Sequence, residues 1–158
     1  MGSANELAAG FRRDLERLIE ELGAFPADEN LWKTLPGVSN SAGNLFLHLE
    51  GNLREYIGRQ LGGVNYNRQR DLEFSRRNVP AAELAARLRP LPDLIAGVVS
   101  GLSEDALGRA YPENVLGTPV STERFLIHLH GHLNYHLGQI DYLRRALTGF
   151  GAIQFKEP

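Results

Sequence analysis

The sequence contains no cysteine among its 158 residues. This absence excludes disulfides, thiolate metal ligands and cysteine nucleophiles, so any bound metal must be held by nitrogen and oxygen ligands. An excess of positive charge is also lacking, since 17 basic residues stand against 19 acidic ones and the net charge is −2. Proteins that bind nucleic acid usually carry a basic surface. We therefore expect no nucleic-acid partner.

Long apolar runs are missing as well. No stretch of about 18 apolar residues could form a membrane-spanning helix, and the first residues lack the apolar block and cleavage site of a signal peptide. The hydrophobic fraction of 42% and the charged fraction of 23% are typical of a globular protein. We expect one cytoplasmic domain over residues 1–158, with no membrane partner.

Strand patterns are scarce, whereas helical periodicity is strong. Apolar residues recur at three- and four-residue spacing in four segments, which predict helices over about 4–23, 41–61, 81–102 and 122–148. Pro90 and Pro92 lie inside the third segment, so we expect a kink or two shorter helices that meet near Arg89. Four amphipathic helices with three connections predict an all-α fold, a four-helix bundle with a kinked third helix.

The connections contain two features of interest. Trp32 is predicted to anchor the first connection by packing against the bundle. The second connection, residues 64–80, contains four arginines that are interrupted by Asp71 and Glu73. Mixed charges of this kind are typical of a solvated loop, and we expect a loop here and again over residues 103–120.

Two of the five histidines lie on the buried face of the last helix. With Phe125 set at zero and about 100° per residue, the apolar stripe is centred near 20 to 30°. His132 lies at about −20° and His136 at about +20°, so both rings should face the core. Because a buried imidazole without a partner costs about 1–3 kcal/mol, a shared metal ion would stabilise both.

A third ligand is expected from another position. His48 lies between Leu45 and Leu49 on the inner side of the second helix, and it would meet the pair if the two helices are neighbours. His128, at about −60°, is the rival third ligand, but one straight helix cannot easily direct three rings at one ion. His130, at about 140°, should lie on the surface. Three neutral imidazoles suit zinc, nickel or another late divalent metal.

Two sequence blocks carry a family resemblance. The segments SNSAGNLFLHLEGNLREYI and HGHLNYHLGQIDYLRRALTG, with the motif H-x-x-x-H-x-G-Q-I from His132 to Ile140, resemble the DinB-like (DinB/YfiT) family of metal-binding four-helix bundles. The resemblance implies a homodimer that binds a divalent metal ion, zinc or nickel, through His48, His132 and His136. Some members of the family transfer or isomerise substrates with low-molecular-weight thiols such as bacillithiol or mycothiol.

Two functions therefore remain open at the level of sequence. The first is a metal-dependent enzyme, either a small-thiol transferase or a hydrolase, in which the three histidines are ligands and water or a small-molecule substrate occupies the open positions. The second is a non-catalytic metal-binding or dimeric interaction module. No general acid or base is assigned, since neither Glu50 nor Glu55 is clearly on the inner face. Gln139 could support a ligand histidine or form a helix–helix contact, while Asn52 and Tyr56 could line the cavity or simply pack.

Overall fold

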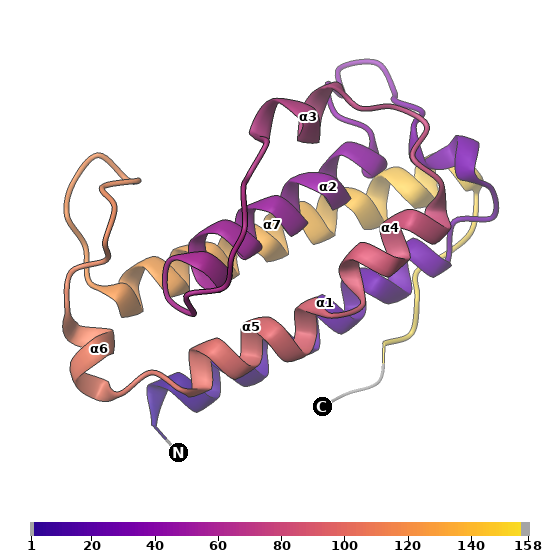
Figure 1. Ribbon diagram of the computed structural model, residues 1–158. Coiled ribbons are helices and arrows are strands. Elements are labelled where there is room, and N and C mark those ends of the chain that lie inside the picture. The colour runs from indigo at the N-terminus through magenta and orange to yellow at the C-terminus, as the bar shows by residue number, and fades with distance from the viewer. Residues whose placement is uncertain (1, 156–158) are drawn as a thin grey trace.

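Helices form nearly all of the regular structure in the computed structural model, which describes residues 2–155. Within that range, the only β pairing is an isolated antiparallel bridge between Ala110 and Ser121. The elements are α1 (Ser3–Gly23), η1 (Asp28–Leu31), α2 (Ala42–Leu53), η2 (Arg54–Arg59), α3 (Arg70–Ser75), α4 (Ala81–Leu88), α5 (Leu91–Ser100), α6 (Glu104–Gly108) and α7 (Thr122–Thr148). The long helical segments, which we call arms, are α1, then α2 with η2, then α4 with α5, and finally α7. They pack into one bundle, with the shorter helices in the connections (Figure 1). The expected all-α fold with four helical arms is confirmed.

Capping and proline chemistry explain where the arms begin and end. Ser41 and Ser121 each accept a hydrogen bond from the backbone N–H three residues later, so both are N-caps of the expected type. The third arm breaks between α4 and α5 at Pro90, as predicted, because proline has no N–H to donate to the preceding turn. Gly149 ends α7 in the left-handed conformation, with φ at 74°.

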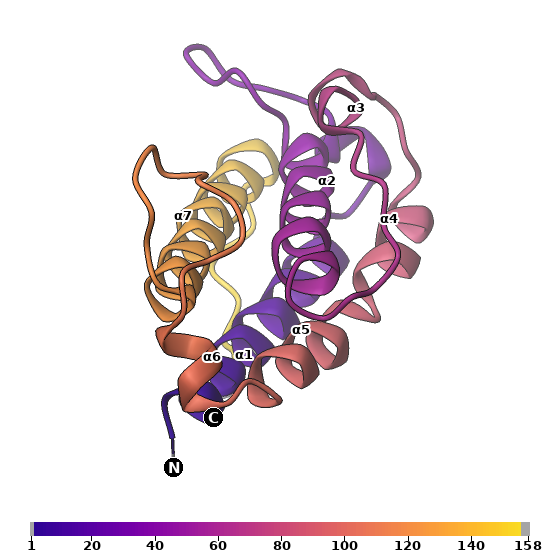
Figure 2. The ribbon, with the colours of Figure 1, turned by 60° about the vertical axis from the view of Figure 1, so that its left-hand side comes forward.

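Each arm contacts two neighbours around the bundle. Helix α7 packs against α1 and α2, and α5 packs against α1 and η2; Figure 2 shows this arrangement from near the end of the bundle. Helices α2 and α7 run in opposite directions, because Tyr56 contacts Phe125 while His48 contacts His132. The core between the arms is apolar, with Phe11, Phe46 and Phe125 almost completely buried.

The second arm changes its winding beyond Leu53. The N–H of Gln60 donates to the carbonyl of Glu55 at 3.1 Å, and the N–H of Gly62 donates to Ile57 at 3.0 Å, so these bonds span five residues. Such wide π turns occur inside α-helices and are frequent at functional sites. The turn rotates η2 relative to a continued α-helix, which redirects the side chains that follow His48 along the arm.

Two short helices occupy segments that the sequence predicted as loops, and these predictions are wrong. Helix α3 lies over α2 because the side chain of Asn44 donates to the carbonyls of Glu73 at 2.9 Å and Arg76 at 3.0 Å. Helix α6 is capped by Ser103, whose hydroxyl accepts from the N–H of Ala106. Helices of five or six residues are too short to show a readable periodicity, and tertiary bonds of this kind hold them in place.

Trp32 packs as predicted, in contact with the core and with its indole N–H donating to Val79 O at 3.2 Å. A buried ion pair also fastens the chain end to the bundle: Arg144 donates to Glu21 at 2.6 Å and to the carbonyl of Gly151 at 3.2 Å. Among the described residues, no helix is long and apolar enough to cross a membrane.

Candidate metal centre

Three histidines from two antiparallel helices meet in the middle of the bundle. The Nε2 atom of His132 lies 3.2 Å from Nε2 of His48 and 3.1 Å from Nε2 of His136. One nitrogen from each ring can be chosen so that all three lie within 4.8 Å of one another. The structure thus brings together the three residues that the sequence nominated, and we refer to them as the histidine cluster.

His48 and His136 are the outer rings of the cluster, and the hydrogen-bond partner of each determines which of its ring nitrogens carries the proton. The Nδ1 atom of His48 lies 2.9 Å from the Glu73 carboxylate, and Nδ1 of His136 lies 2.7 Å from Oε1 of Gln139. Both oxygens can only accept, so each Nδ1 donates and each Nε2 keeps its lone pair. Two lone pairs therefore point at His132.

His132 is the residue that the protein leaves unsatisfied. Its Nδ1 is buried without a hydrogen-bond partner. If its Nε2 carries the proton, it can donate to only one of the two facing lone pairs. A cation bound between the three rings would use all three lone pairs at once, so the donor set fits a divalent metal ion.

Burial favours the neutral form of the two α7 rings of the cluster. Desolvation, followed by the proximity of His136 and His48, lowers the pKa of His132 to about 4. Desolvation also lowers the pKa of His136, and the hydrogen bond to Gln139 only partly opposes it. Metal ligands must be deprotonated, so these shifts keep the imidazoles ready to bind a cation.

Glu73 supports the cluster, although the sequence placed it in a solvated loop. It is 6% exposed, and Arg68 binds its carboxylate through two bonds of 2.7 and 3.0 Å. Burial raises the pKa of Glu73, but the hydrogen bonds from His48 and Arg68 outweigh that effect and hold the pKa below its ordinary value. A carboxylate in this position orients a ligand histidine and raises its basicity. The prediction of a solvated loop is wrong here, because a charge pattern does not reveal that α3 folds back on α2.

A glycine makes room for this carboxylate. A Cβ atom on Gly51 would lie 2.8 Å from Cδ of Glu73 and closer still to its Oε1, so a larger residue would displace the side chain. The exchange of Gly51 for any other residue is therefore incompatible with the observed Glu73 position. In the sequence, Gly51 within a helical pattern was the one available signal of a close approach.

The other two histidines lie outside the cluster. His128 is exposed and its ring stacks on Phe125, with centroids 6.0 Å apart, so the structure favours His48 over the rival ligand. His130 is not on the open surface as predicted, because its Nε2 bonds to the fully buried Asp14 at 2.8 Å and its side chain is 26% exposed. Helix α7 packs against α1 as well as α2, so the face opposite the cluster is also covered.

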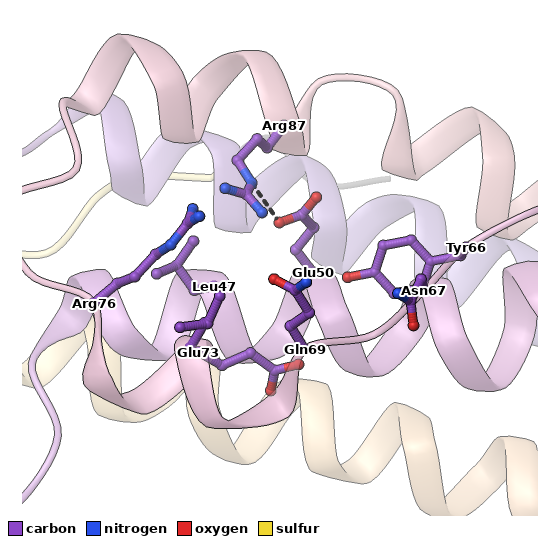
Figure 3. Close-up of a pocket in the computed structure, with 9 residues that line it drawn as sticks. Leu47, Glu50, Tyr66, Asn67, Gln69, Glu73, Arg76 and Arg87 are labelled. Atoms are coloured by element: carbon purple, nitrogen blue, oxygen red, sulfur yellow. Dashed lines mark hydrogen bonds and ion pairs between the residues drawn. The ribbon is translucent and has the colours of Figure 1, made fainter.

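The remaining polar candidates are divided among three sites. Asn52 is buried and its Oδ1 has no hydrogen-bond partner. Tyr56 lines an open polar pocket with Glu55. Glu50 points to the third arm, where Arg87 donates to it at 2.8 Å beside a small pocket of about 110 Å³, which Figure 3 shows with Tyr66 and Glu73. None of the acids among the described residues lies within the histidine cluster itself.

Comparisons with known proteins identify the family and the fold of the chain. The family model described as mycothiol-S-transferase matches residues 7–149. Among solved structures, a DinB-like protein from Bacillus cereus shares the fold, with a TM-score of 0.69 at 19% identity over 93% of this chain and 95% of that chain. No curated protein matches the chain. The DinB-like resemblance read from the two histidine blocks is thus confirmed.

Proposed function

Because the chain belongs to the mycothiol-S-transferase family, we propose that it is a metal-dependent enzyme that joins mycothiol, or a closely related small thiol, through its sulfur to an electrophile. His48, His132 and His136 are the proposed ligands, and zinc or nickel is the proposed ion. The assignment agrees with the low-molecular-weight thiol and the three-histidine site expected from the sequence. A homodimer remains a prediction.

One observation carries this proposal: the outer rings present two Nε2 lone pairs to His132, whose own Nδ1 has no partner. A hydrogen-bonded core of three histidines would be expected to satisfy each ring. Here His132 can donate to at most one of the two facing lone pairs, whereas a cation could be bound by all three Nε2 atoms. This arrangement suits a cation better than it suits structural packing.

The chemistry divides between the ion and the chain. A bound divalent ion would act as a Lewis acid that stabilises a thiolate at neutral pH. Glu73 and Gln139 fix the orientation of His48 and His136, so that their Nε2 atoms remain acceptors. His132 stays neutral because it is buried. No acid in the cluster is available to take the thiol proton, so that proton leaves to solvent.

The test combines metal content with transfer activity. Protein purified without a nickel column is expected to hold about one divalent ion per chain and to conjugate mycothiol to an electrophile. His132→Ala should lose the ion and at least about a hundredfold in kcat/KM, while its circular dichroism spectrum stays helical. His128→Ala is the matched control, because it removes an exposed histidine of the same helix.

Two results would overturn the proposal. Full transfer activity in His132→Ala would show that the cluster is not the reaction centre. A stoichiometric metal ion with no thiol transfer would favour the non-catalytic metal-binding module instead.

A further inference from the structure

A pocket lies on each side of the histidine cluster along the second arm. One pocket, of about 460 Å³, lies toward the start of α2 and the end of α7, because Leu45 and Leu143 both line it. The other, of about 400 Å³, lies toward the end of the second arm, where Tyr56 and Arg59 line it. Both volumes fall in the range typical of small-molecule sites. Since Leu45 precedes His48 along the second arm and Tyr56 follows it, the two pockets lie on opposite sides of the cluster.

The two pockets differ in chemistry. The first is mainly apolar, and we call it the apolar pocket; its main side chains are Leu35, Val38, Leu45, Tyr142, Leu143 and Ala146. The second contains almost only hydrogen-bonding groups, and we call it the polar pocket; its main side chains are Glu55, Tyr56, Arg59, Tyr66, Asn67 and Arg70. Tyrosine rings beside guanidinium and amide groups are suited to polyhydroxylated rings, because the rings can stack while the hydroxyls form hydrogen bonds.

Each pocket also shares one residue with the supports of the cluster. Gln139 lines the apolar pocket and binds Nδ1 of His136. Arg68 lines the polar pocket and binds Glu73, which binds Nδ1 of His48. Hydrogen bonds therefore link one lining residue of each pocket to the cluster, directly through Gln139 and by way of Glu73 through Arg68.

We propose that the polar pocket binds the carbohydrate part of the thiol and that the apolar pocket binds the electrophile, so that the two substrates meet at the histidine cluster from opposite directions along the second arm. This inference rests on the proposed function, because it assigns the substrates of the same reaction. Mycothiol carries its sulfur on a cysteinyl arm attached to two polyhydroxylated rings, which matches the polar pocket. An apolar electrophile, such as an aromatic halide, matches the apolar pocket.

The spacing along α2 is compatible with this assignment. Tyr56 is eight residues beyond His48, a rise of about 12 Å along a helix. The cysteinyl arm alone is shorter than this rise, so the sulfur reaches the cluster when one ring of the thiol extends from Tyr56 toward His48. Asn52 lies between these two residues, and its buried Oδ1 has no partner, so it is the acceptor we assign to the amide N–H of that arm.

The reaction used in the test is a substitution on 1-chloro-2,4-dinitrobenzene. The sulfur lone pair forms a C–S bond at the ring carbon that carries chlorine. The C–Cl bond breaks and chloride leaves with its electron pair. The thiol proton passes to solvent, and nothing is oxidised or reduced.

The kinetic test compares variants of the two pockets. Ala146→Phe fills the apolar pocket from an exposed position on α7, and it should raise KM for the dinitrobenzene at least about fivefold while KM for mycothiol changes less than twofold. Asn67→Ala and Arg70→Ala should raise KM for mycothiol about fivefold while KM for the dinitrobenzene changes less than about twofold, since the loss of one hydrogen bond corresponds to about fivefold in affinity. Ala9→Phe and Arg89→Ala are matched controls at exposed positions outside both pockets.

A binding test without metal separates this inference from the proposed function. Metal-free protein should bind the sulfur-free glucosaminyl-inositol and the unreactive 1,3-dinitrobenzene at the same time, as measured by calorimetry. Asn67→Ala should weaken only the first ligand and Ala146→Phe only the second. If wild-type protein transfers no thiol but the probes bind in this pattern, the proposed reaction fails and the two sites stand. If the probes compete, if neither binds, or if each variant affects both substrates equally, the division between the pockets is overturned.

Discussion

Glu73 shows how a single buried residue can determine the state of a site without entering it. Its carboxylate accepts one hydrogen bond from Nδ1–H of His48 and two from Arg68, while Gly51 leaves the space that it occupies. Because the carboxylate can only accept, His48 is held in the tautomer whose Nε2 faces the cluster. The orientation of one proposed ligand thus depends on a residue 25 positions away in the chain.

We predict that Glu73→Gln weakens metal binding by about tenfold or more, because the amide is uncharged and orients His48 less strongly. Metal affinity measured by chelator competition tests this. Glu16→Gln, at an exposed position on α1, is the control and should bind metal like wild type. Unchanged affinity in Glu73→Gln would show that His48 does not need the carboxylate.

At the scale of elements, the site depends on α3 lying across α2. Asn44 holds α3 through its backbone carbonyls, and Phe74 of α3 places its ring 4.9 Å from the ring of His48. The π turn that follows α2 then redirects Tyr56 toward the polar pocket. The histidine, its support and the neighbouring pocket are therefore positioned by one arm and the short helix packed on it.

Gly51→Ala tests the contact between these two helices. Alanine normally stabilises a helix by about 0.5–1 kcal/mol relative to glycine, but here its Cβ would overlap the Glu73 carboxylate. We expect metal affinity to fall about tenfold and the free energy of unfolding to decrease, as measured by chelator competition and urea denaturation. Gly97→Ala in α5, where a Cβ meets nothing within 4 Å, should bind metal normally and be slightly more stable. A Gly51→Ala protein that matched this control would contradict the packing described.

At the scale of the whole molecule, the bundle keeps ionisable groups in its interior, and stability should therefore depend on pH. In the folded protein the pKa of His132 is about 4, against 6.5 for a histidine that the fold does not perturb. Between these values the unfolded chain binds a proton that the folded chain does not, so stability is retained above pH 6.5 and lost as pH falls toward 4. The pKa values of Glu73 and Asp14 are lowered in the folded protein, so their contribution to stability is lost only below about pH 4.5.

We predict that metal-free protein loses stability between pH 6.5 and 4.5, by at most about 1.4 kcal/mol per pH unit from His132. Urea denaturation at several pH values in the presence of a chelator measures this slope. His132→Asn should reduce the slope, whereas His128→Asn should leave it unchanged because that ring is exposed. Equal slopes in all three proteins would exclude His132 as the source.

Much of the fold and the candidate site could be predicted from local sequence. The four arms follow from helical periodicity, their ends from Ser41, Ser121 and Gly149, and the break in the third arm from Pro90. These signals act over a few residues, so they can be read without knowing the tertiary structure. The positions of His132 and His136 on one stripe belong to the same class, and so does the place of His48 between Leu45 and Leu49 on the inner side of its helix, which the family resemblance also implied.

The tertiary structure alone decided the surroundings of these residues. Contacts between segments far apart in the chain bury Glu73, partly cover His130 and form the two pockets. Periodicity describes how side chains are arranged around one helix, but it does not say which faces other elements cover. The sequence by itself determined the helices and the three histidines, whereas packing determined their hydrogen-bond partners, their supports and the two pockets on either side of them.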